Sequence, residues 1–152
     1  RDVAALVLEA IGDDYGIARR DLGGRYDHWI GRARALVKAG RGHVILSGKG
    51  CLGFSARRFL SVADPAQVEA RLFNMAGPLR EFAAIRAPVL AVLPEREEFA
   101  CIPVPEMAER LKAVSRARPF EAAIIPRADH GFRGEEAATT RLILRWLRAL
   151  RA

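Results

Sequence analysis

The hydrophobic positions of the chain include three apolar runs of strand length, at residues 3–8, 88–93 and 120–126, the last with a single charged residue, Glu121. Runs without polar alternation are typical of strands buried on both faces, as in a parallel sheet covered by helices on each side. Helical patterns follow the second and third runs, which gives the alternating order of an α/β sheet. The pattern therefore predicts an α/β fold in which the three runs are adjacent parallel strands.

Two amphipathic helices are expected to flank this sheet. Residues 104–117 place Met107, Leu111 and Val114 on one face, and Pro105 suits the first turn of a helix. The residues after the third run place large apolar side chains on one face of a helix: Leu142, Ile143, Trp146, Leu147 and Leu150. We expect both helices to cover the sheet.

The segment 13–87 does not keep this order and is predicted to be mostly helical and outside the sheet. A helix is expected over residues 27–42, with Gly40 as its C-terminal stop. A second helix is expected to begin with Asp64 as N-cap and Pro65 at the first helical position. A helical segment inserted between two core strands is typical of a lid. Its large apolar residues predict that such a lid covers an apolar pocket: Trp29, Leu36, Phe54, Phe59 and Phe73.

Length and composition favour a single folded α/β domain spanning residues 1–152, because 51% hydrophobic content is enough for a sizeable core. The net charge of +7 comes from scattered arginines without interleaved aromatic residues, so no nucleic-acid partner is expected. No apolar stretch approaches a membrane span and no signal peptide is apparent. We therefore expect a soluble, cytoplasmic protein with no membrane partner. Cys51 and Cys101 lack disulfide or metal spacing, and neither a metal nor another cofactor is expected.

Gly48, Gly50 and Gly53 spell the G-x-G-x-x-G pattern of a dinucleotide-binding loop. That fingerprint also requires a second strand ending in an acidic residue about twenty positions later. The corresponding stretch here is helical in pattern and interrupted by prolines. The pattern therefore favours a flexible glycine-rich turn over a nucleotide site.

His130 and Glu97 are the best candidates for chemistry. His130 comes just after the third apolar run, and Glu97 lies four residues beyond the second. Parallel strands end at the same edge of a sheet, so the two side chains are expected to lie within reach of each other. A carboxylate there can hold the imidazole in one tautomer and stabilise its protonated form. We predict that His130 is a general base oriented by Glu97, and that the neighbouring Asp129 caps the loop.

Around these residues the chain resembles the C-terminal end of an α/β-hydrolase. The segments that carry the resemblance are "IRAPVLAVLPERE" and "IPRADHGFRGEEAATTRLILRWL", in which a Pro-Val-Leu strand leads to an acidic turn and Ala-Asp-His follows the next strand. "VAALVLEA" resembles the strand before the lid of that fold, and "WIGRARALVKAGRG" and "SARRFL" resemble lid segments. The resemblance implies a Ser-acid-His triad that hydrolyses an ester, amide or related acyl bond of a small molecule. Glu97 stands where aspartate is usual and Pro94 where glycine is usual, which leaves Glu95 and Glu98 open as the acid.

The nucleophile is not evident in this sequence. No G-x-S-x-G occurs, and the four serines lack the flanking small residues of a nucleophile elbow: Ser47, Ser55, Ser61 and Ser115. No candidate oxyanion-hole loop is apparent either. We therefore expect the serine upstream of Arg1 or on another chain, which makes this the C-terminal portion of a hydrolase that needs an N-terminal half.

Two alternatives stay open. Gly12, Asp14 and Gly16 fit G-x-D-x-G, so Asp14 could itself be a nucleophile. The residues after it are polar and broken by Gly23 and Gly24, whereas an elbow opens into a buried helix. The other alternative is a non-catalytic small-molecule binding module with the same sheet.

Overall fold

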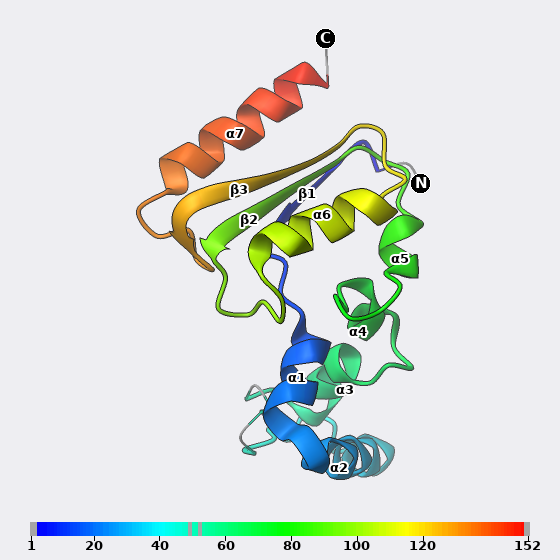
Figure 1. Cartoon of the computed structure of the whole chain (residues 1–152). Coiled ribbons are helices and arrows are strands. Elements are labelled where there is room, and N and C mark those ends of the chain that lie inside the picture. The colour runs from blue at the N-terminus through cyan, green and yellow to red at the C-terminus, as the bar shows by residue number, and fades with distance from the viewer. Residues whose placement is uncertain (1–2, 49, 52, 151–152) are drawn as a thin grey trace. The chain divides into compact units, whose positions relative to one another are not determined.

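The computed structural model describes residues 3–48, 50–51 and 53–150 (Figure 1). The chain divides into two compact units, one formed by Arg1–Gly12 with Phe82–Ala152 and the other by Asp13–Glu81. The first unit contains the sheet and the second is helical. None of the described helices is long and apolar enough to cross a bilayer.

The sheet unit has three parallel strands, β1 (Leu6–Glu9), β2 (Val89–Arg96) and β3 (Phe120–Asp129), in the order β1-β2-β3. The prediction of three adjacent parallel strands is confirmed. The first strand is shorter than its apolar run, because regular pairing with β2 starts at Leu6 and ends at Glu9. The other two extend beyond their runs into polar residues, which carries acidic side chains to the ends of the strands.

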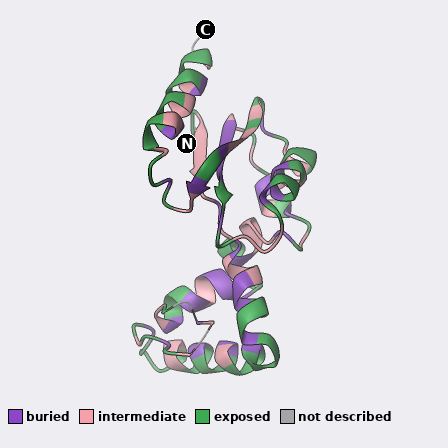
Figure 2. Ribbon diagram, turned by 60° about the vertical axis from the view of Figure 1, so that its left-hand side comes forward, coloured by how far each residue is buried: buried purple, intermediate pink, exposed green. Residues whose placement is uncertain are grey.

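Helices cover both faces of this sheet, as Figure 2 shows with α7 and α6 on opposite sides of the strands. The helix α7 (Glu136–Ala149) packs Trp146 against Leu90 and Val92 of β2. The helix α6 (Val104–Val114) buries Met107 and Leu111 and contacts β2 and β3. Because β2 is the central strand, its apolar residues are buried on both faces, as continuous apolar runs predict. The mixed α/β class with a parallel sheet and flanking helices is therefore confirmed.

The second unit is built from short helices. They are α1 (Asp14–Leu22), the 3-10 turn η1 (Gly23–Arg25), α2 (Tyr26–Lys38), α3 (Ala56–Ala63) and α4 (Val68–Leu72); α5 (Arg80–Ala83) follows at the passage between the units. Gly40 has a φ of 72° just after the end of α2, which confirms its predicted role as the stop of that helix.

The N-cap predicted at Asp64 is wrong. Asp64 instead follows the end of α3, where its carboxylate accepts hydrogen bonds from the Arg34 guanidinium, at 2.7 and 2.9 Å, and from Ala66 N at 3.0 Å. The next helix begins only at Val68, after Gln67. The ion pair with Arg34, which sequence spacing does not reveal, holds the buried carboxylate in a turn.

Four of the five apolar side chains expected to line a pocket belong to the core of this unit or pack against it, and the fifth, Phe73, is half-buried. Phe59 is fully buried, and Trp29, Leu36 and Phe54 pack against the same cluster. Tyr26 belongs to that cluster too, and its hydroxyl donates a hydrogen bond to the carbonyl of Ala63. These side chains are thus buried by the packing of the helices of this unit on one another.

Candidate active site

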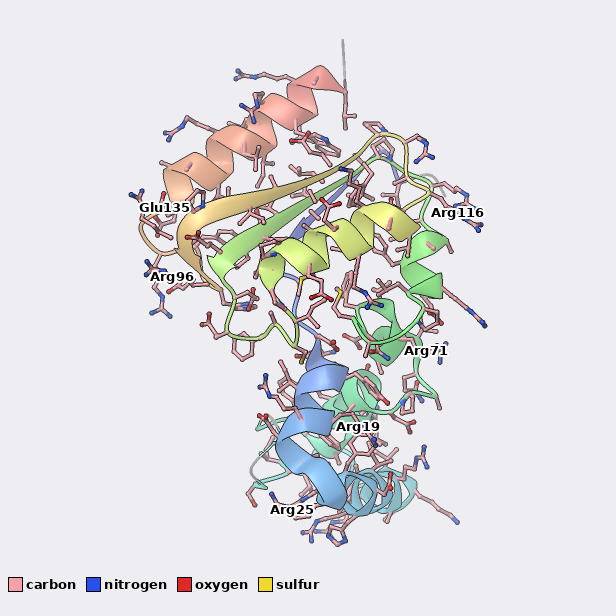
Figure 3. All side chains as sticks on the ribbon, in the orientation of Figure 1. Arg19, Arg25, Arg71, Arg96, Arg116 and Glu135 are labelled. Atoms are coloured by element: carbon pink, nitrogen blue, oxygen red, sulfur yellow. The ribbon has the colours of Figure 1, made fainter. Side chains whose placement is uncertain are left out.

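The candidate site lies at the C-terminal ends of β2 and β3. Arg96 and Asp129 are paired across the two strands, so the residues that follow them, Glu97 and His130, leave the sheet side by side. Figure 3 labels Arg96 and Glu135 at this end of the sheet. The parallel direction of the strands is what brings together two residues that are 33 positions apart.

The predicted contact between Glu97 and His130 is present. Glu97 Oε1 lies 2.8 Å from His130 Nδ1, within the range expected for a hydrogen bond. The Glu97 side chain is 1% exposed, whereas that of His130 is 40% exposed. The same oxygen, Oε1, also accepts a hydrogen bond from Phe99 N at 3.0 Å. The carboxylate is therefore fixed by the turn that carries it, and the imidazole extends from it toward solvent.

The chemistry of the carboxylate assigns the tautomer of the histidine. An ionised carboxylate only accepts hydrogen bonds, so the proton of the neutral ring lies on Nδ1 and the lone pair on Nε2. Within the described part of the chain, no group hydrogen-bonds to Nε2 of His130. The partly exposed ring thus presents a basic nitrogen, which is the arrangement that a general base requires.

Phe99 completes the surroundings of the imidazole. The centroids of the Phe99 and His130 rings are 4.6 Å apart, with an interplanar angle of 74°. This edge-to-face contact restricts rotation of the histidine ring. Phe99 thus contributes both a backbone donor to the acid and a wall beside the base, a role that the sequence pattern did not indicate.

Glu95 and Glu98 do not hydrogen-bond to the imidazole. Glu95 Oε2 accepts from Arg127 N at 2.7 Å, and Glu98 Oε2 accepts from His130 N at 3.2 Å. Of the three acids that remained possible partners, Glu97 alone contacts the ring in the structure.

Asp129 caps the loop, as predicted. Its Oδ1 accepts from Gly131 N at 3.0 Å and from Arg133 N at 3.1 Å. Asp129 therefore fixes the backbone next to the histidine, whereas Glu97 hydrogen-bonds to the imidazole.

Asp14, the alternative nucleophile, is the first residue of α1 in the helical unit. That helix has nine residues and ends at Leu22, with Gly23 as its C-cap, which matches the interruption expected at Gly23. The residue before it, Asp13, is buried and serves as N-cap, accepting from Gly16 N at 2.7 Å and Met75 N at 3.0 Å. The G-x-D-x-G pattern therefore marks a capped helix start.

The glycine-rich segment has a packing explanation. A Cβ at Gly48 would come within 2.2 Å of the Trp29 ring, and Gly50, with a φ of 88°, lies close to Leu22. Lys49, between these two glycines, lies outside the described residues. Glycine is needed here because the loop passes closely over two helices.

The serines with assigned contacts serve local structure. Ser55 Oγ is the N-cap of α3, accepting from Arg58 N at 3.3 Å; Ser61 Oγ donates to Glu69; and Ser115 Oγ accepts from Ala117 N at 3.2 Å. Ser115 lies before β3, at the end of the strand opposite to His130. Ser55 and Ser115 thus act as local caps, and Ser61, within α3, binds the Glu69 carboxylate.

The other titratable candidates also have ordinary surroundings. His28 contacts the Trp29 ring edge-to-face, and His43 is exposed. Cys51 is buried and Cys101 half-buried, both as free thiols, and burial raises the pKa of the Cys51 thiol. No group of three His, Cys, Asp or Glu residues that could hold a metal ion occurs in the described residues.

Comparison of the chain with models of known protein families and with curated protein sequences finds no match.

Proposed function

We propose that this chain is the C-terminal portion of a serine α/β-hydrolase and supplies the histidine and the acid of a Ser-acid-His triad. The reaction is hydrolysis of an ester, amide or related acyl bond in a small molecule. The observation that carries the proposal is the 2.8 Å contact between Glu97 and His130 at the C-terminal edge of a parallel sheet.

His130 is the general base in this account. Nε2 accepts the proton of the attacking hydroxyl and later returns it to the leaving group. Glu97 holds the neutral ring in the Nδ1-protonated tautomer and stabilises the imidazolium that forms. Burial of Glu97 strengthens this electrostatic effect, because little water screens the carboxylate.

The nucleophile in this account is a serine that these 152 residues do not contain, contributed by an upstream segment or a second chain. The free edge of the sheet supports such a partner. In the described part of the chain, β1 pairs only with β2, and its apolar residues Leu6, Val7 and Leu8 are only half-buried. An unpaired apolar strand edge favours addition of another strand. Residues 13–87 would form the lid.

A fluorophosphonate probe tests this proposal, because it reacts covalently with activated serines. The native protein is labelled, digested and mapped, and its intact mass and N-terminal sequence show which segments precede or accompany Arg1. We expect a labelled serine outside these 152 residues, with labelling abolished by His130→Ala and preserved by His43→Ala. Labelling of Ser47, Ser55, Ser61 or Ser115, or no labelled serine at all, would refute a serine from outside this chain.

A further inference from the structure

The strand that carries His130 bends before it reaches the site. β3 pairs residue by residue with β2 as far as Ile125, opposite Pro94. The next pair is Arg96 with Asp129, so β3 advances four residues while β2 advances two. Residues of β3 in such a bulge lose their ladder partners, and their backbone N–H groups need other acceptors.

Carboxylates at the end of β2 and in the turn after it supply these acceptors. Glu95 Oε2 takes the N–H of Arg127 at 2.7 Å, inside the bulge, and Glu98 Oε2 takes the N–H of His130 at 3.2 Å, just past the strand. Pro126, which also lies in the bulge, has no N–H to satisfy. Glu95, near the end of β2, and Glu98, in the turn after it, thus accept two backbone N–H groups of the bent segment and its continuation.

Arg127 is the residue most in need of this support. Its φ is 62°, a left-handed conformation that is unfavourable for a residue with a side chain. Its guanidinium in turn donates from Nε and Nη2 to Glu135 Oε1, at 3.1 and 2.9 Å, at the start of α7. Arg127 therefore hydrogen-bonds to Glu95 of β2 through its backbone and to Glu135 at the start of α7 through its side chain.

The three acids at and just after the end of β2 have different hydrogen-bond partners. Glu97 hydrogen-bonds to the imidazole, whereas Glu95 and Glu98 accept from the backbone N–H groups of Arg127 and His130. A hydrogen bond to the ring fixes the rotation of the ring. Nδ1 can reach Glu97 Oε1, however, only if the backbone at His130 holds the position that it has at the end of β3. A displacement of about 1 Å in a catalytic group can cost a factor of about 100 in rate.

We infer that Glu95 and Glu98 are positioning residues that hold the bent end of β3 so that His130 meets Glu97. Their function is to accept the N–H groups of Arg127 and His130. The catalytic meaning of this role rests on the proposed function, but the positioning itself can be measured without turnover.

The test compares Glu95→Ala, Glu98→Ala and the double alanine variant with the matched glutamine variants, which keep a hydrogen-bond acceptor. Glu109→Ala, an exposed acid on α6, is the control. The ¹⁵N chemical shifts of the His130 ring report the population of the Nδ1-protonated tautomer. The exchange rates of the Arg127 and His130 amide protons with water report their hydrogen bonds.

We expect the Nδ1-protonated tautomer to lose its dominance in the double alanine variant, and the two amide protons to exchange about tenfold faster. The glutamine variants should retain the parent signals, and Glu109→Ala should not change them. Alanine variants with the tautomer signature of the parent would overturn the inference, as would glutamine variants that lose it as fully as the alanine variants.

The outcome is separable from that of the proposed function. If the ring signals respond as expected while His130→Ala leaves ester hydrolysis unchanged, the positioning role stands and the hydrolase proposal fails. If His130→Ala abolishes hydrolysis while the ring signals are the same in the Glu95 and Glu98 variants as in the parent, the hydrolase proposal stands and the positioning role fails.

Discussion

Glu97 Oε1 lies 2.8 Å from His130 Nδ1, while the other carboxylate oxygen of Glu97, Oε2, is buried with no hydrogen-bond donor among the described residues. A buried carboxylate with one unsatisfied oxygen costs stability, since burial removes its water without replacing it. Such an arrangement is typical of a site retained for chemistry, where a stability cost is tolerated.

Replacement of Glu97 by glutamine should separate the effect of the carboxylate on stability from its effect on turnover. Glutamine has the same shape and removes the buried charge, but places an NH2 where Oε2 has no partner, so we expect stability to change by only about 1 kcal/mol. Turnover of the complete protein should fall by several orders of magnitude, because a neutral amide cannot stabilise the imidazolium. Urea unfolding and ester hydrolysis measure the two quantities. Glu106→Gln, an exposed acid on α6, is the control, and an undiminished turnover of the Glu97 variant would contradict its role.

The sheet and the helices that cover it could be predicted because each has a long pattern of apolar residues in the sequence. The apolar runs that became β2 and β3 show no regular polar alternation, which favours a parallel sheet. The central strand β2 is buried on both faces, whereas β3, beside it, is mostly half-buried. The apolar stripe of α7 likewise matches a helix packed on one side only. Parallel strand direction then brings the chain segments after β2 and β3 together, so the Glu97–His130 contact could be predicted as well.

The details of the site could not be predicted, since they depend on local geometry. Glu95 lies in β2 and Glu97 and Glu98 come just after it, and the register shift between Pro94 and Arg96 bears on which of them faces the ring. The cap assigned to Asp64 failed for a similar reason: its partner Arg34 lies 30 residues away in the sequence. Contacts between distant side chains leave no periodic signal.

Two glycine substitutions test the packing explanation of the glycine-rich segment. Gly48→Ala places a Cβ within 2.2 Å of the Trp29 ring, so we expect a loss of about 1 to 3 kcal/mol in the free energy of unfolding. Gly31→Ala is the matched control, because Gly31 lies exposed in α2 with open space around it. The free energy of unfolding of Gly31→Ala should rise by about 0.5 to 1 kcal/mol, because alanine has the higher helix propensity. Equal effects of the two substitutions in urea unfolding would refute the packing role of Gly48.

Tyr26 should make the stability of the helical unit sensitive to high pH. Burial, and to a smaller extent nearby Tyr15, raise the pKa of Tyr26 to about 12, against the opposing effect of Arg19. The unfolded chain ionises at a pH of about 10. The stability contributed by the neutral phenol is therefore complete below pH 10 and lost as pH rises from 10 to 12, by up to about 1.4 kcal/mol per pH unit.

Urea unfolding at pH 9 and pH 11 measures this loss. We expect Tyr26→Phe to reduce the difference between the two pH values, although it also lowers stability at pH 9 by removing the hydrogen bond to Ala63. Tyr15→Phe removes the other tyrosine of the chain and should retain most of the difference. An unchanged pH dependence in Tyr26→Phe would show that other groups cause it.

Asp13 should be a major stabilising residue of the helical unit. Its carboxylate caps α1 through Gly16 N and binds Met75 N from 62 residues away, and burial raises its pKa despite these two bonds. Asp13→Ala removes both acceptors, and we expect a loss of about 2 to 3 kcal/mol in the free energy of unfolding. Asp27→Ala, at an exposed position in the first turn of α2, should change it by less than about 0.5 kcal/mol. Equal thermal stability of the two variants would contradict the role of Asp13.

The rate at which the complete native protein hydrolyses an activated ester, compared between His130→Ala and the parent, tests the catalytic account most directly. The imidazole of His130 is partly exposed and, among the described residues, hydrogen-bonds only through Nδ1, so its removal should leave folding and substrate binding nearly unchanged. His43→Ala removes an exposed histidine of the helical unit and serves as the control. We predict that His130→Ala lowers kcat by several orders of magnitude while KM changes little and His43→Ala retains the parent rate. A His130→Ala variant that turns over the ester as fast as the parent would contradict the assignment of His130 as general base.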